Sequence, residues 1–190
     1  MSIPVLPITN PHYGTGVYRR RIRLMPGEGH VCAELEDNNH GFRVGIEHDG
    51  RSITGITGDA LRTPLSTCPG ALARLQRLVG ANVHSDATQL SRRADPASNC
   101  THWLDLCILA INHIPRGAVD RQYDVAVTDE RDGASELSVH CNGVAVHLWH
   151  ASGLALTAPE PLAGRTLFRG FSSWARDCFS GDALEAALVL

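Results

Sequence analysis

The side chains best suited to chemistry lie near the middle of the chain, where Cys100 and His102 are two positions apart. They open a segment that begins with Ser98, a residue typical of helix caps, and continues with apolar residues at helical spacing. We therefore expect a core helix with both side chains in its first turn. There, backbone amides lack helical partners and the helix dipole favours a thiolate. Such a pair is suited to binding a metal ion.

Two further residues complete a candidate metal site. Cys68 directly precedes Pro69, a residue favoured at the first helical position, so Cys68 also lies at a predicted helix N-terminus. Two thiolates and two imidazoles form the tetrahedral set that zinc prefers, and iron or another transition ion also uses such ligands. The predicted metal ligands are His40, Cys68, Cys100 and His102, with His48 or Asp105 as the replacement if His40 is not a ligand.

This metal set requires Cys100 to lie at or before the first helical residue. Positions two apart inside a helix point away from each other, so Cys100 and His102 could not otherwise reach one ion. Two alternatives need no metal. In a catalytic pocket, His102 activates a nucleophilic Cys100 or acts as a general base, and Asp105 orients its imidazole. In the other alternative these side chains are only packed, since cysteine is among the most commonly buried residues.

Candidate substrate-binding residues come from elsewhere in the chain. Residues 17–24 alternate in character and carry a basic face, which in most proteins is simply solvated. The alternative is that an arginine from Arg19 to Arg23, or Arg62, holds a carboxylate or phosphate of a substrate. The predicted substrate-binding residues are Arg20, Arg62 and Trp174. Whether His48, His140 or His147 belongs to the site stays open.

Alternating residues predict the elements that position these side chains. Expected strands cover 17–24, 29–37, 42–47, 52–56, 122–128, 135–141, 144–150 and 154–158, and expected helices cover 68–79, 98–113 and 171–190. Asp49-Gly50 and Asn142-Gly143 predict tight hairpins. This order indicates an α+β fold with an antiparallel, curved sheet, built of two meanders or hairpins, on a central helix.

Length and composition bound the domain organisation and the partners. The 190 residues suit one domain over 17–190, preceded by a Pro- and Gly-containing extended arm over 1–16. A net charge of −3 argues against a nucleic-acid partner. We find neither a membrane span nor a leader, and the six cysteines include no CxxC pair, so we expect a cytoplasmic protein with free or metal-bound thiols.

Several motifs together resemble those of a known family. They are His40-Gly41-Phe42, His48-Asp49-Gly50, Arg62-Thr63-Pro64, Cys68-Pro69-Gly70-Ala71, Cys100-Thr101-His102-Trp103-Leu104-Asp105-Leu106 and Gly170-Phe171-Ser172-Ser173-Trp174-Ala175. Over nearly the whole chain this pattern resembles the bacterial domain of unknown function 2889 family. Trp103 stands where that family more often has a small aliphatic residue. The resemblance implies a cytoplasmic bacterial protein loosely associated with small-molecule catabolism, and brings no assigned activity.

Two hypotheses for the function follow. The first is a small-molecule enzyme of the lyase, hydrolase or isomerase type, because no dinucleotide or flavin fingerprint and no other nucleotide-binding loop is present. Its pocket would hold the Cys and His residues, with a zinc or other transition ion as the only expected cofactor. The second is a non-catalytic subunit or binding module with a structural metal or with packed Cys and His alone. A homo-oligomer is compatible with both.

Overall fold

A computed structural model describes residues 15–190, so the predicted N-terminal arm lies outside the described residues except for its last two positions. Eight strands form one antiparallel sheet in the order β4-β3-β2-β1-β5-β6-β7-β8. The strands are β1 (Val17–Gly27), β2 (His30–Asp37), β3 (Gly41–His48), β4 (Ile53–Arg62), β5 (Arg121–Thr128), β6 (Ser135–Cys141), β7 (Val144–Ser152) and β8 (Ala155–Ala158). The predicted α+β class and antiparallel sheet are confirmed.

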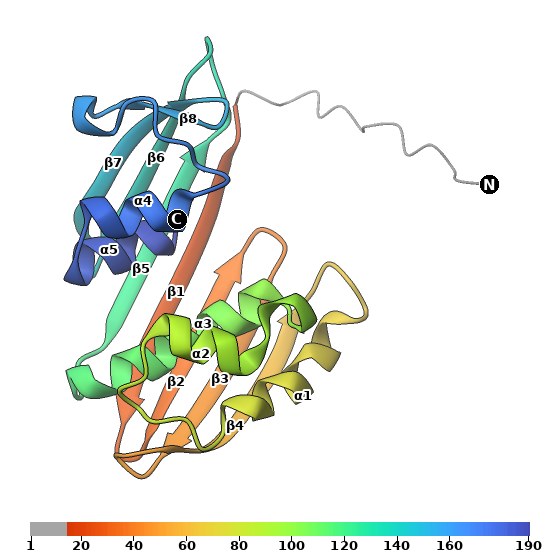
Figure 1. Cartoon of the computed structure of the whole chain (residues 1–190). Coiled ribbons are helices and arrows are strands. Elements are labelled where there is room, and N and C mark those ends of the chain that lie inside the picture. Colours follow the sequence, from red (N-terminus) through yellow and green to blue (C-terminus); the bar gives the residue numbers. More distant parts are fainter. Residues whose placement is uncertain (1–14) are drawn as a thin grey trace. The chain divides into compact units, whose positions relative to one another are not determined.

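The chain forms two compact units. The first, here the meander unit, comprises Arg19–Val125 and His140–Ala145, and the second, here the C-terminal unit, comprises 15–18, Ala126–Val139 and Val146–Leu190. Each unit is built on its own share of the strands and its own helices (Figure 1). The single domain expected over 17–190 stays a prediction.

The meander unit takes its shape from alternating residues on β1 to β4. Ile22 on β1 lies opposite Leu35 on β2, and Leu35 lies opposite Phe42 on β3, so these apolar side chains share one buried face. The charged side chains between them, such as Arg23 and Glu34, share the other face and pair with each other. One face of this part of the sheet is therefore core.

Helix α3 (Thr101–His113) packs on that buried face, against β2 and β3 (Figure 1). Trp103 is fully buried there, with its ring centroid 4.7 Å from that of Phe42. Gly58 on β4 makes this possible, because a Cβ at that position would lie 2.6 Å from the Trp103 ring. The packing of a large indole against a glycine thus sets the depth at which α3 rests on the sheet.

The start of α3 differs from its predicted position. Cys100, not Ser98, is the N-cap, and its side chain makes no capping hydrogen bond. Ser98 instead ends a short 3-10 helix, η3 (Pro96–Ser98), where its hydroxyl donates to the Asp95 carbonyl. The predicted cap was wrong because Asp95, in a left-handed conformation before Pro96, starts a separate turn that takes up the serine.

The remaining helices of the meander unit are short. The segment beginning at Cys68 contains η1 (Cys68–Ala71), α1 (Leu72–Leu75) and η2 (Gln76–Leu78), which confirms a helical segment there. Helix α2 (Ala87–Ala94) is not among the helices predicted from the sequence. A capping box explains the difference, since the Asp86 carboxylate accepts from the Gln89 amide and the Gln89 side chain accepts from the Asp86 amide. A last turn, η4 (Ile114–Arg116), follows α3.

The C-terminal unit is built around aromatic side chains. Helices α4 (Phe171–Cys178) and α5 (Gly181–Leu188) follow the short η5 (Glu160–Leu162) and lie over the β6–β7 hairpin (Figure 1). Trp149 and Trp174 are in its core, with ring centroids 6.0 Å apart. The Trp174 indole N–H donates to the Thr166 carbonyl at 2.8 Å. Among residues 15–190, no helix has both the length and the apolar character needed to cross a membrane.

Candidate metal centre

One group of metal-ligating side chains stands out among the described residues. Ligand atoms of Asp37, His40 and His102 all lie within 4.8 Å of one another. Asp37 ends β2, His40 lies in the turn before β3, and His102 is the second residue of α3. Because α3 packs on β2 and β3, the fold brings its first turn to the end of these strands. All three residues belong to the meander unit.

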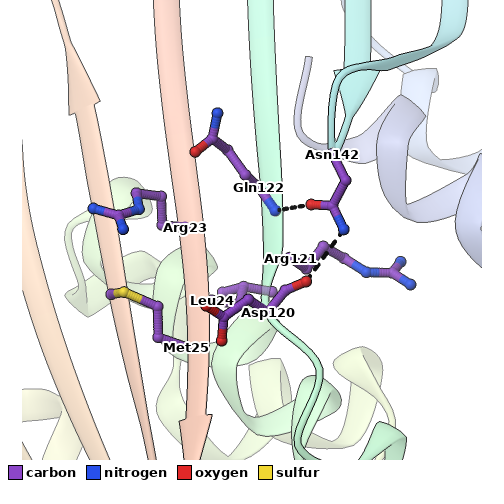
Figure 2. Close-up of a pocket in the computed structure, with 7 residues that line it drawn as sticks. All are labelled: Arg23, Leu24, Met25, Asp120, Arg121, Gln122 and Asn142. Atoms are coloured by element: carbon purple, nitrogen blue, oxygen red, sulfur yellow. Dashed lines mark hydrogen bonds between the residues drawn. The ribbon is translucent and has the colours of Figure 1, made fainter.

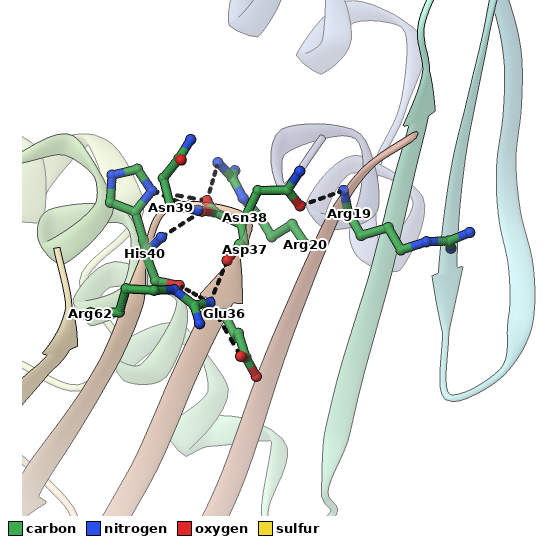
Figure 3. Close-up of polar contacts among 8 residues, drawn as sticks. All are labelled: Arg19, Arg20, Glu36, Asp37, Asn38, Asn39, His40 and Arg62. Carbon is green, nitrogen blue, oxygen red and sulfur yellow. Dashed lines mark hydrogen bonds and ion pairs between the residues drawn. The ribbon is translucent and has the colours of Figure 1, made fainter. Parts of the chain in front are cut away.

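Asp37 organises the turn that carries His40. Its Oδ1 accepts hydrogen bonds from the backbone amides of Asn39 and His40, both at 2.8 Å, in the geometry typical of an Asx turn (Figure 3). The same oxygen lies 2.9 Å from Nδ1 of His40. An ionised carboxylate only accepts, so Nδ1 is the donor and His40 keeps its Nε2 lone pair. The turn therefore presents His40 in one tautomer.

Two arginines surround this turn. Nη2 of Arg62 donates to the carbonyls of Asp37 and His40 and to the Glu36 carboxylate (Figure 3). Nη2 of Arg20 lies 3.5 Å from Oδ2 of Asp37, whose side chain is only 1% exposed. Arg62 thus braces the backbone of the turn, whereas Arg20 faces its carboxylate.

The two imidazoles of the cluster stack on each other. The ring centroids of His40 and His102 are 3.9 Å apart, with 27° between the ring planes. Burial lowers the pKa of His102 most, protonation of His40 and the charge of Arg20 would lower it further, and Asp37 opposes them. His102 is therefore neutral near pH 7, the form that binds metals.

The predicted cysteine ligands are not in this cluster. Cys100 meets the condition of preceding the first helical residue, yet it and Cys68 are outside the group formed by Asp37, His40 and His102. All six cysteines are free thiols.

Asp37 is the residue that sequence analysis missed. The signal was present in Asp37-Asn38-Asn39-His40, because an aspartate before such a turn places its carboxylate on the amides two and three residues ahead. A histidine at that third position then lies within reach of the same carboxylate.

The other candidate residues are placed elsewhere. Asp105 is an exposed residue of α3 whose pKa is raised by desolvation and lowered by the charge of Arg20. His48 accepts from the Gly50 amide through Nδ1, within the β3–β4 turn. His140 lies on β6, where its charge helps to lower the pKa of Asp124. His147 and Trp174 belong to the C-terminal unit, in which both are buried.

A separate pocket of about 330 Å³ lies on the meander unit, between the end of β1 and the start of β5 (Figure 2). It is lined by Arg23, Leu24, Met25, Asp120, Arg121, Gln122 and Asn142. The Asn142 side chain accepts from the Gln122 amide and donates to the Asp120 carbonyl. It thus links the β6–β7 turn to the backbone around the start of β5. None of the lining residues belongs to the metal-ligating cluster.

Comparison of the chain with models of protein families, with curated proteins and with solved structures returned no match. The similarity to the domain of unknown function 2889 family therefore stays a prediction that rests on the sequence motifs alone.

Proposed function

We propose that Asp37, His40 and His102 bind a divalent transition metal, with zinc as the best-suited ion, in an enzyme that acts on small molecules. One observation carries this proposal, namely the approach of two imidazoles and a carboxylate to within 4.8 Å of one another. The reaction class is a lyase, hydrolase or isomerase. A cytoplasmic location and membership of the domain of unknown function 2889 family belong to the same proposal.

The donor set fits such an ion. Two imidazoles and one carboxylate are ligands that zinc and iron(II) both use in catalytic sites with open positions. Ligand atoms of a tetrahedral zinc lie about 3.4 Å apart. Asp37 Oδ1 and His40 Nδ1 are 2.9 Å apart and the ligand atoms of all three residues lie within 4.8 Å, so binding would need only small adjustments. The turn can provide this movement at His40, whose side chain is 14% exposed, while Asp37 stays anchored by two backbone amides.

Each residue then has a defined task. A bound zinc supplies a Lewis acid and lowers the pKa of a coordinated water. For Asp37 and His40 to hold the same ion, the ligand atom of His40 would be Nδ1, which lies 2.9 Å from Asp37 Oδ1, and the ion would replace the proton shared by these two atoms. His102 contributes a neutral imidazole held against the apolar wall formed by Phe42, with ring centroids 6.4 Å apart. Arg62 holds the turn in place through its carbonyls.

A second candidate is a metal-free general base made by Asp37 and His40. The observation that favours it is the 2.9 Å contact between Asp37 Oδ1 and His40 Nδ1. A buried carboxylate that accepts from one ring nitrogen raises the basicity of the other, as in catalytic carboxylate–histidine pairs. The non-catalytic alternative, a binding module with a structural metal, uses the same ligands as the first proposal.

Zinc titration of the purified protein, followed by calorimetry and elemental analysis, separates these candidates. We expect one zinc per chain in the wild type, and loss of zinc in His40→Ala and His102→Ala. His30→Ala is the matched control, because His30 is exposed at the start of β2 and outside the cluster. A folded wild type that takes up no stoichiometric metal refutes the metal centre and leaves the Asp37–His40 base. If zinc binds and its removal unfolds the protein, the ion is structural.

A further inference from the structure

The arginines near the cluster differ in what they face. Side chains alternate along β1, so Arg21 and Arg23 share the solvent face of the sheet while Arg20 points to the other. Arg21 pairs with Asp124 at 2.7 Å, and Arg23 pairs with Glu34 at 3.3 Å. The Arg19 side chain extends away from Asp37 (Figure 3). Of these arginines on β1, Arg20 is therefore the one whose side chain points towards the cluster.

Arg20 lies directly beside the candidate ligands. Its Nη2 is 3.5 Å from Oδ2 of Asp37, and its side chain is 21% exposed, against 58% for Arg21. The ligand atoms of Asp37 lie in turn within 4.8 Å of those of His40 and His102. A partly buried guanidinium at this position therefore lies beside the carboxylate that meets the two imidazoles and is still within reach of solvent.

The carboxylate that faces Arg20 is also engaged by other donors. Asp37, its carboxylate partner, already accepts from two backbone amides and from His40. Cys100 leaves the N-terminus of α3 without a side-chain cap, so the positive end of the helix dipole adds to the charge of the arginine. Arg62 does not compete for the same task, since its Nη2 bonds the carbonyls of the turn.

We infer that the substrate of this site is a small carboxylate, which pairs with Arg20 beside the stacked His40 and His102 rings. This inference rests on the proposed metal centre and names the substrate class that it serves. A guanidinium is a planar fork that matches the two oxygens of a carboxylate, and a partly desolvated site strengthens such a pair. The remainder of the substrate then lies over the imidazoles.

The test compares two probes of nearly equal size on zinc-loaded protein. Glycolate carries a carboxylate, and glycolamide replaces it with a neutral amide. We expect calorimetry to show that the wild type binds glycolate at least about tenfold more tightly than glycolamide, because a charge-assisted pair contributes that much. Arg20→Gln should abolish the preference. Arg23→Gln, two residues along on the opposite face of β1, should keep it.

The zinc content of every variant is measured first, so that the two proposals fail separately. If the wild type binds no zinc, the metal centre is refuted and this inference with it. If zinc binds but the wild type shows no preference, or Arg20→Gln keeps it, only the inference is overturned. Inorganic phosphate is a third probe, and tighter binding of phosphate than of glycolate overturns the assignment to a carboxylate.

Arg20→Lys covers the case in which Arg20→Gln loses zinc or fails to fold. Lysine keeps the charge that faces Asp37 but lacks the fork that binds both carboxylate oxygens. We expect this variant to retain zinc and to bind glycolate several-fold more weakly. Undiminished glycolate binding by Arg20→Lys would overturn the inference.

Discussion

Two histidines, His102 in the meander unit and His147 in the C-terminal unit, both have a pKa lowered mainly by desolvation, yet they have different neighbours and different roles. Burial is the main cause that lowers the pKa of both His102 and His147. His147 packs between Trp149 and Phe179, with ring centroids 4.8 Å and 4.7 Å away, and its Nε2 donates to the Ala183 carbonyl. His102 instead faces a second imidazole and, through it, a carboxylate.

The two histidines differ in the side chains that surround them rather than in the main cause of their lowered pKa. A histidine surrounded by aromatic rings, with one backbone carbonyl as its partner, has its bonding satisfied within the core. A histidine that shares its surroundings with Asp37, His40 and Arg20 has groups beside it that can move a proton or hold an ion. The first environment stabilises the C-terminal unit, and the second is the basis of the proposed function.

The largest effect is expected at Asp37. Asp37→Ala removes a buried carboxylate that accepts from two amides and from His40, so we expect the free energy of unfolding to fall by about 3 kcal/mol and zinc binding to be lost. Urea denaturation and zinc titration measure the two effects. Asp49→Ala is the matched control, because Asp49 accepts from the Arg51 and Ser52 amides in a similar but exposed turn. Equal losses in both variants would contradict a special role for Asp37.

A smaller effect is expected from Gly58→Ala, which would displace Trp103 on α3 and, with it, the neighbouring ligand His102. The added Cβ would lie 2.6 Å from the Trp103 ring and 3.0 Å from the Arg43 carbonyl, so α3 must shift on the sheet. We expect a loss of about 2 kcal/mol in urea denaturation and weaker zinc binding, since His102 precedes Trp103. Gly70→Ala, where nothing lies within 4 Å of the new Cβ, is the control. Unchanged stability of Gly58→Ala would show that α3 does not depend on this contact.

The pH dependence of stability tests the role of His147. Its pKa is lower in the folded protein than its ordinary value of 6.5, so the neutral form is favoured by folding. This contribution is fully present above pH 6.5 and is lost as the pH falls through the folded pKa. We expect the free energy of unfolding of the wild type to fall more steeply on acidification than that of His147→Gln. His150→Gln, exposed on the same strand, should behave like the wild type.

The smallest effect is expected at the cysteines. Because Cys68 and Cys100 are outside the cluster, the double substitution to serine should leave zinc content and zinc affinity unchanged. Elemental analysis after zinc loading measures this directly. Loss of the ion from a folded double variant would instead support the ligand set predicted from sequence, with two thiolates and two imidazoles.

Much of the fold follows from local patterns. Alternation along β1 to β3 predicts which face is buried, and Asn142-Gly143 predicts the hairpin between β6 and β7, where both residues have positive φ. The predicted cap of α3 was wrong and α2 was not predicted, since Asp95 and Asp86 each form turns that depend on residues three positions away. Local hydrogen bonds of this kind compete closely in energy, so spacing alone does not select among them.

The sequence by itself determined the antiparallel strands and the core helix, and it predicted His40 and His102 as candidate ligands, because hydrophobic periodicity and residue chemistry are local properties. Only the tertiary structure decided which side chains meet. The packing of α3 on β2 and β3 places His102 on His40, the β2–β3 turn brings Asp37 to them, and Cys100 stays outside this group. Such convergence depends on the packing of elements distant in the chain, and residue spacing along the sequence does not contain it.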